Sequence, residues 1–117
     1  MSLRKQYYFG QSDRGLMAWD VDRLVALSAG FPRRPIRVDA LPIDHDWSDD
    51  VEGHARLVAE ADLSFPVILA SNGAVMDGRH RIAKARQLGL TSIDAVQFEV
   101  DPPPDYVGVE PDQLPYD

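Results

Sequence analysis

The sequence predicts an α/β (α+β) domain in which a small mixed sheet packs against two or three helices. An apolar run over residues 65–70 precedes Ser71-Asn72-Gly73 and a second short apolar run, and Asn-Gly between two such runs is a strong β-hairpin signal. Residues 35–41 alternate between apolar and polar, as a half-buried strand does, and residues 91–100 indicate another strand. Residues 20–29, 49–62 and 77–88 have the apolar spacing and the end signals of helices.

Composition limits the possible classes of protein. The 117 residues are enough for one ordinary domain, and the 44% of hydrophobic residues can build a core. The chain has no cysteine, which excludes disulfides, a thiolate nucleophile and a cysteine-based metal site. Without an apolar run of about 18 residues or a secretory signal, we expect no membrane span and a cytoplasmic location.

Charge is unevenly distributed along the chain. The net charge is −7, and residues 87–117 contain seven acidic and no basic residues. Affinity for nucleic acid depends on neutralising phosphates, so we expect no DNA binding by this chain alone. We predict a folded domain over residues 1–100 and a Pro-rich acidic tail over residues 101–117, which is extended or disordered. Aromatic and apolar residues of the tail could contact the domain or a protein partner.

The first half of the chain contains two predicted helices and two predicted strands. Residues 4–9 are aromatic and could form an edge strand or a docking arm. Asp20 caps a helix that ends before Gly30 and Pro32. The spacing of Asp49 and Glu52 resembles a capping box at the start of a second helix. The residues predicted on the buried faces of these helices are Val21, Leu24, Val25 and Ser28 in the first, and Val51, Ala55, Val58 and Ala61 in the second.

The third predicted helix carries a concentration of basic residues at its start. Asp77 is the expected N-cap, Gly78 permits a close approach of the backbone, and Gly89 suits the C-terminus. The apolar stripe consists of Ile82, Ala85 and Leu88. A helix start offers free N–H groups and a positive dipole end, which favour anions.

We therefore predict a phosphate site at this helix start, formed by Asp77, Gly78, Arg79, His80, Arg81 and Lys84. Arginine presents a planar fork that matches phosphate, and histidine donates to oxygen near neutral pH. The plainer alternative is a capped amphipathic helix whose basic residues are solvated.

Residues 77–85 resemble the signature of the ParB/sulfiredoxin superfamily, and the chain is most similar to small ParB-like proteins. Members carry a Gly-x-(His/Arg)-Arg motif at a helix N-terminus and bind nucleotide phosphates there. ParB binds CTP, sulfiredoxin binds ATP, and a free-serine kinase of this fold also binds a nucleotide. The resemblance covers about residues 34–100 and is sharp from 65 to 98.

The resemblance implies a fold, a ligand and roles for individual residues. Gly78 and the backbone after it would hold phosphate, and His80 and Arg81 match the paired basic positions of the family. Arg79 stands where sulfiredoxin has its catalytic cysteine, so we expect no sulfinic-acid reductase activity. The implied ligand is a nucleoside triphosphate, ATP or CTP, with or without Mg²⁺.

Catalysis would need carboxylates or a base besides the phosphate site. The acidic loop over residues 42–50 supplies the candidates His45 and Asp46, either to hold Mg²⁺ or to accept a proton. Together with His54 and Asp49 or Asp50, they also have the residue types of a metal site, although their spacing matches no defined motif. The alternative is that these residues cap a helix and remain in water.

Two functions from different classes follow. The first is a nucleotide-dependent enzyme that hydrolyses a nucleoside triphosphate or transfers its phosphoryl group to a small acceptor. The second is a non-catalytic, nucleotide-responsive module related to ParB that acts through a protein partner. A third, plainer possibility is a structural domain whose helix start binds only stray anions.

Overall fold

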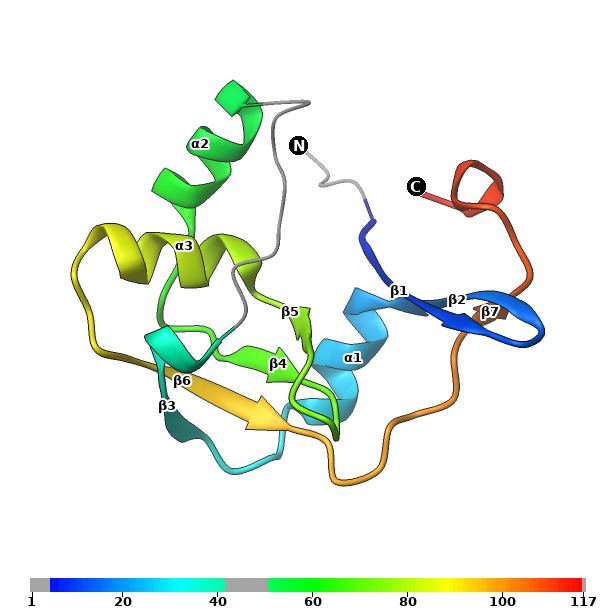
Figure 1. Ribbon diagram of the computed structural model, residues 1–117, viewed down its shortest axis with the longest axis horizontal. Coiled ribbons are helices and arrows are strands. Elements are labelled where there is room, and N and C mark those ends of the chain that lie inside the picture. The colour runs from blue at the N-terminus through cyan, green and yellow to red at the C-terminus, as the bar shows by residue number, and fades with distance from the viewer. Residues whose placement is uncertain (1–4, 42–50, 117) are drawn as a thin grey trace.

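The computed structural model describes residues 5–41 and 51–116, and they form a mixed α/β domain with three α-helices and two small sheets (Figure 1). The predicted fold class is confirmed. The larger sheet has the order β3-β6-β4-β5, from β3 (Arg34–Arg37), β6 (Ser92–Gln97), β4 (Val67–Leu69) and β5 (Val75–Asp77). Only β4 and β6 are parallel, and the other neighbours are antiparallel.

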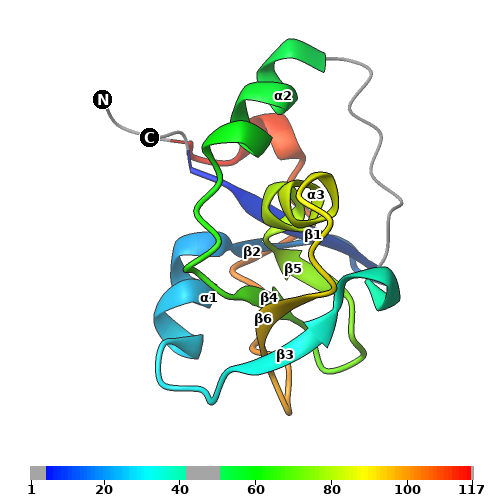
Figure 2. The same cartoon turned by 90° about the vertical axis from the view of Figure 1, so that its left-hand side faces the viewer.

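Strand β4 of the larger sheet is buried on both faces. Alternate residues of a strand point to opposite sides of a sheet. Val67 and Leu69 of β4 pack under Ile82 and Ala85 of α3 (Arg79–Gln87). Ile68, on the other face, belongs to a second cluster. That cluster also contains Leu24 of α1 (Val21–Ser28) and Trp19 of β2 (Gly15–Asp20). The two helices therefore lie on different sides of β4 (Figure 2).

The predicted hairpin between β4 and β5 is confirmed. The Ala70 N–H donates to the Ala74 carbonyl at 2.8 Å, and the Gly73 N–H donates to the Ala70 carbonyl at 2.9 Å. The amide oxygen of Asn72 accepts from the Ala74 N–H at 2.9 Å. Gly73 has φ 89°, which a side chain would disfavour. The local turn chemistry therefore fixes the register of this strand pair.

The first helix begins where it was predicted. The Asp20 side chain accepts from the Asp22 N–H at 2.9 Å, as an N-cap does. Leu24 and Ser28 are buried, whereas Val25 is 48% exposed. The prediction for Val25 was wrong because the buried face of α1 is narrower than the apolar stripe in its sequence.

The prediction of a strand over residues 35–41 was wrong beyond Arg37. The chain forms a single 3₁₀ turn over Val38–Ala40, and the Val38 N–H donates to the Thr91 carbonyl at 3.0 Å. Val38 and Leu41 are both buried against α3. Their spacing of three residues places both on one side of a 3₁₀ turn, while a strand would point them to opposite faces.

The second helix, α2 (Val51–Glu60), packs against α3 and away from the sheet (Figure 1). Val58 is buried, but Ala55 is exposed and Ala61 is only half-buried. The predicted stripe was therefore wrong for these two alanines, because contact with a single helix covers a narrow strip of surface. The predicted cap residue Asp49 and the side chain of Val51 lie outside the described residues.

The C-terminal end of α3 follows the predicted signal. Gly89 has φ 71°, its N–H donates to the Arg86 carbonyl at 3.1 Å, and the Leu90 N–H donates to the Ala85 carbonyl at 2.9 Å. This pair of bonds is the Schellman arrangement that ends many helices. Leu88 is 59% exposed, so its predicted place in the buried stripe was wrong. Leu88 is the C-cap residue and lies beyond the last residue of α3.

The second sheet, of order β1-β2-β7, joins the two ends of the described chain. The sequence predicts an edge strand or a docking arm over residues 4–9, and β1 (Tyr7–Ser12) is an edge strand. The tail is extended, as one of the alternatives predicted, and β7 (Tyr106–Val107) pairs with Met17 and Ala18 of β2.

Side chains attach the tail to the rest of the domain as well. The indole N–H of Trp19 donates to the Pro102 carbonyl, and the Asp20 N–H donates to the Asp105 carboxylate, each at 2.8 Å. Leu114 is 5% exposed. These contacts bury apolar surface and satisfy backbone groups, so the tail stabilises the fold that it covers.

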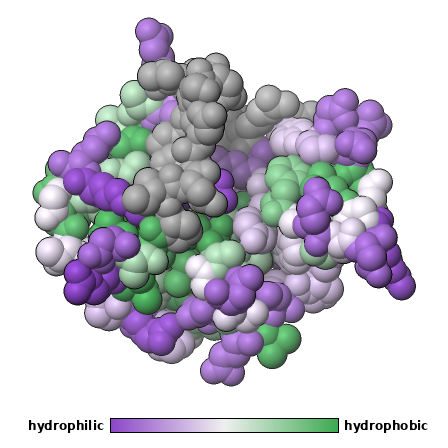
Figure 3. All heavy atoms as spheres, viewed as in Figure 1, coloured by the Kyte–Doolittle hydropathy of each residue, from purple (hydrophilic) through white to green (hydrophobic). Residues whose placement is uncertain are grey.

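The described surface includes several exposed large hydrophobic side chains, among them Phe65, Leu88 and Val100. Figure 3 shows hydrophilic residues over much of one face, with apolar residues between them. Within residues 5–41 and 51–116, no helix has the length and apolar character needed to cross a membrane.

Candidate phosphate-binding site

Gly78 occupies the N-cap position of α3, with φ 114° and ψ 16°. A Cβ atom there would lie 3.0 Å from Val67 Cγ2, 3.2 Å from Val67 Cα and 3.1 Å from a guanidinium nitrogen of Arg81. The positive φ and this crowding both require glycine. The backbone of Gly78 therefore lies close to strand β4. This packing is enough to explain why a glycine is found there.

Asp77 is not the N-cap, so that prediction was wrong. It is the last residue of β5, and its carboxylate accepts from the Arg81 guanidinium at 2.9 Å. Gly78 is inserted between strand and helix and has no side chain to cap the first-turn N–H groups. The Asp77 side chain instead forms an i,i+4 ion pair, in which the two side chains are 19% and 17% exposed.

The ion pair orients the Arg81 side chain. Its Nη2 group bonds Asp77, and its Nε atom is buried without a hydrogen-bond partner in the described part of the chain. A buried, unsatisfied donor costs free energy. The guanidinium group is thus oriented at the helix start and has hydrogen-bonding capacity that Asp77 does not use.

His80 pairs with a histidine of α2. The Nδ1 atom of His54 lies 2.9 Å from the Nε2 atom of His80, and the rings are stacked at 5.2 Å with an interplanar angle of 13°. One ring nitrogen must donate and the other must accept, so at least one of the two rings is neutral in this arrangement. His80 therefore links α3 to α2 at the candidate site.

The other basic residues of α3 differ in their surroundings. Arg79, the first residue of the helix, is exposed. The Lys84 ammonium group donates to the carbonyls of Ala59 and Ala61, both at 2.8 Å. The structure thus brings Asp77, Gly78, Arg79, His80 and Arg81 together, while the Lys84 ammonium group contacts the C-terminal end of α2. A role for Lys84 in binding phosphate stays a prediction.

The proposed catalytic residues His45 and Asp46 lie outside the described residues, as do Asp49 and Asp50. In the two described ranges, no group of three or more histidine, cysteine or acidic residues is arranged to hold a metal ion. Asp77 is the carboxylate that adjoins the helix start there, and Arg81 holds it.

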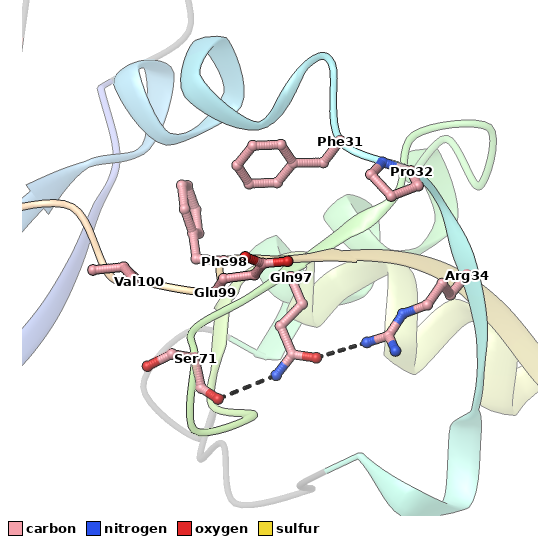
Figure 4. A pocket seen from close by; sticks show the side chains of 8 residues that line it. All are labelled: Phe31, Pro32, Arg34, Ser71, Gln97, Phe98, Glu99 and Val100. Atoms are coloured by element: carbon pink, nitrogen blue, oxygen red, sulfur yellow. Dashed lines mark hydrogen bonds between the residues drawn. The ribbon is translucent and has the colours of Figure 1, made fainter.

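Sequence reasoning missed a pocket of about 830 Å³ at the other end of the sheet. Its lining comes from Phe31, Pro32, Arg34, Ser71 and residues 97–100 (Figure 4). These segments are far apart in the sequence, and only the pairing of β3, β6 and β4 brings them together. The one local signal is the pair of aromatic residues, Phe31 and Phe98, placed just beyond an element end.

Comparison of the chain with known protein families, with curated proteins and with solved structures found no match.

Proposed function

We propose that this chain is a nucleotide-binding domain of the ParB/sulfiredoxin type, which holds the phosphates of ATP or CTP at the start of α3. The proposal rests on the structure at the start of α3. The N-cap is a glycine that cannot cap the first turn, and Arg79 and Arg81 extend from the same turn. A helix start without a side-chain cap is a favourable place for a phosphate.

The charges at the site suit a nucleotide that carries Mg²⁺. Arg79, Arg81 and the helix dipole attract phosphate, whereas the Asp77 carboxylate opposes it. A magnesium ion bound to the phosphates would offset that repulsion. We therefore expect the magnesium complex of the nucleotide to bind more tightly than the free nucleotide.

A bound triphosphate supplies an activated phosphoryl group, which can pass to water or to another acceptor. The backbone after Gly78 would hold its oxygens, and the two arginines would balance their charge. Asp46 or His45 is proposed as the metal ligand or general base, so that the protein would be a hydrolase or a phosphotransferase.

The state of Asp77 favours a second candidate, the nucleotide-responsive module without turnover. Within the described ranges, the carboxylate beside the helix start is engaged with Arg81 and is poorly placed to accept a proton. In this version the nucleotide changes how the domain binds a protein partner, with the C-terminal tail as one candidate surface.

Binding can be tested by calorimetry with ATP, CTP and GTP, with and without Mg²⁺. Arg79→Gln and Arg81→Gln should each weaken nucleotide binding by about tenfold or more, which is the loss expected for one charge-assisted hydrogen bond. Arg56→Gln, which removes an exposed arginine of α2, is the matched control. Unchanged affinity in both α3 variants would reject the site.

Turnover separates the two candidate functions. Release of inorganic phosphate, or labelling of an acceptor, identifies an enzyme. Loss of turnover with retained binding in Asp46→Asn would assign catalysis to that residue. Binding without turnover of any nucleotide supports the module.

A further inference from the structure

The pocket of about 830 Å³ lies at the end of the sheet where the parallel strands β4 and β6 finish. Val67, at the start of β4, contacts the position of Gly78, while Ser71, just beyond the end of β4, lines the pocket. Four residues of extended chain separate the two places by about 13 Å. In open parallel α/β sheets, ligands bind outside the carboxyl ends of the strands, and β4 and β6 are parallel neighbours here. The pocket is thus a second place, distinct from the start of α3.

One wall of the pocket is apolar and well ordered by its packing. The rings of Phe31 and Phe98 meet edge to face, with centroids 5.1 Å apart and an interplanar angle of 82°. Phe98 is 5% exposed and belongs to the core cluster on the α1 side of the sheet. The core therefore fixes a surface that suits an apolar side chain.

The opposite wall carries a guanidinium group that its neighbours orient (Figure 4). Arg34 donates to the amide oxygen of Gln97 at 2.7 Å. The amide nitrogen of Gln97 donates in turn to the carbonyls of Ala70, at 3.0 Å, and Ser71, at 3.4 Å. This chain of bonds joins the ends of β3, β6 and β4 and holds the arginine at the pocket. Its other N–H groups can form the two-pronged contact with a carboxylate.

Glu99 lines the same pocket and adds a negative charge to it. A ligand that is only an anion would be repelled by Glu99, and one that is only a cation would be repelled by Arg34. A ligand with both charges satisfies the two residues together. The apolar wall additionally requires an apolar group on that ligand.

We propose that this pocket binds a small zwitterion with an apolar side chain, which is the chemistry of an apolar amino acid or of a dipeptide. Its carboxylate contacts Arg34, its ammonium group contacts Glu99, and its side chain packs against Phe31 and Phe98. The volume is in the usual range for small-molecule sites and accommodates either ligand.

The test is a titration of the ¹⁵N-labelled full chain followed by amide NMR spectra, with affinities from the same titrations. The four probes are L-phenylalanine, L-leucyl-L-phenylalanine, 3-phenylpropionate, which lacks the ammonium group, and phenethylamine, which lacks the carboxylate. We expect shifts of the amides of Ser71 and residues 97–100, without matching shifts at residues 78–81. The two zwitterions should bind more tightly than the two singly charged probes, and their ratio decides between amino acid and dipeptide.

Two variants assign the charges. Arg34→Gln should weaken zwitterion binding by about tenfold, while Arg37→Gln, on the same strand but paired with Asp39, should not change it. Glu99→Gln should remove the preference for L-phenylalanine over 3-phenylpropionate. Thermal unfolding of each variant checks that the fold is retained.

The proposal is overturned if none of the four probes shifts the pocket amides. Shifts that survive unchanged in Arg34→Gln, or that respond equally to Arg37→Gln, overturn it as well. A preference for 3-phenylpropionate would overturn the assignment of Glu99. Because nucleotide binding is measured separately with the Arg79 and Arg81 variants, either result can fail without the other.

Discussion

The fold itself requires a glycine at position 78, where the backbone passes from β5 to α3. Its φ of 114° and the nearness of Val67 both exclude a side chain. A substitution here therefore changes the stability of the domain as well as a binding site, and loss of binding in such a variant would not identify a phosphate contact. Substitution of the exposed Arg79 is the cleaner measurement, because Arg81 is also the ion-pair partner of the half-buried Asp77.

Replacement of Gly78 by alanine should reduce the free energy of unfolding by about 2 kcal/mol or more, from backbone strain and crowding against β4. Gly89→Ala separates the two causes, because Gly89 also has a positive φ but its Cβ would meet nothing within 4 Å. Gly30→Ala, with open space and no positive φ, is the neutral control. Urea unfolding should rank the losses as Gly78, then Gly89, then Gly30, and equal losses at Gly78 and Gly89 would contradict the crowding argument.

At the scale of elements, α2 is the least buried helix among those described, and it is attached mainly through side chains of α3. Lys84 donates to the carbonyl of Ala59 in α2 and to that of Ala61 just beyond it, and His80 stacks on His54. These polar contacts therefore add to the packing of the buried Val58 in attaching α2 to α3. A ligand at the start of α3 would bind next to the residues that position α2.

Removal of the Lys84 ammonium group tests this attachment. Lys84→Met keeps most of the apolar stem but leaves the Ala59 and Ala61 carbonyls without their donor, so stability should fall by about 1–2 kcal/mol. Hydrogen exchange should accelerate in α2 more than in β4 or β6. Arg56→Met, at an exposed position of α2, controls for the loss of a positive charge, and equal exchange in both variants would contradict the prediction.

The turn after α2 gives a prediction for pH. Hydrogen bonds from the Ser64 side chain and backbone hold the pKa of Asp62 below its usual value. A carboxylate with a lowered folded pKa stabilises the fold above the unfolded pKa, about 3.9, and that contribution disappears as pH falls through the lowered value. The stability difference between wild type and Asp62→Asn should be constant above about pH 5 and should shrink toward zero in stronger acid. Asp112→Asn is the control, and a difference that grew on acidification would give the wrong sign.

At the scale of the whole molecule, residues of both sheets pack in one core cluster. The C-terminal segment supplies β7, an edge strand of the smaller sheet. Trp19 and Met17 of β2 pack with Ile68 and Val96 of the larger sheet. The tail then covers β2 through β7 and through the Trp19 bond to Pro102. Deletion of the tail should therefore destabilise the core of the domain.

Deletion of residues 104–117 should lower the melting temperature by about 10 °C or more. The deletion removes β7, the hydrogen bonds of Asp105 and the buried side chain of Leu114. Asp105→Asn should show a smaller loss, because it keeps the strand and the apolar contact. An unchanged melting temperature after the deletion would show that these contacts contribute nothing.

Local signals predicted the parts of the fold that local chemistry determines. Asn72-Gly73 predicted the hairpin turn, Asp20 predicted the start of α1, and Gly89 predicted the end of α3. The errors arose where tertiary packing chooses between local options. Val38 and Leu41 fit both a strand and a 3₁₀ turn, and their burial against α3 selects the turn.

The candidate site was predictable as a concentration of residues but not as an arrangement. The basic residues at the start of α3 are adjacent in the sequence, so their clustering follows from the helix. Their partners do not, because the contacts of Lys84 and His80 depend on where α2 lies. The pocket at the ends of β4 and β6 could not be predicted from the sequence either, because its lining comes from three separate segments.

The seam between the two ends of the described chain has a practical consequence. The Lys5 N–H donates to the Tyr116 carbonyl at 3.1 Å, and the Tyr7 hydroxyl donates to the Pro115 carbonyl. A short flexible linker could therefore join the ends covalently, and new termini could be opened in the exposed turn at Asp13 and Arg14, between β1 and β2. Such a circular permutant would retain every strand pairing described here.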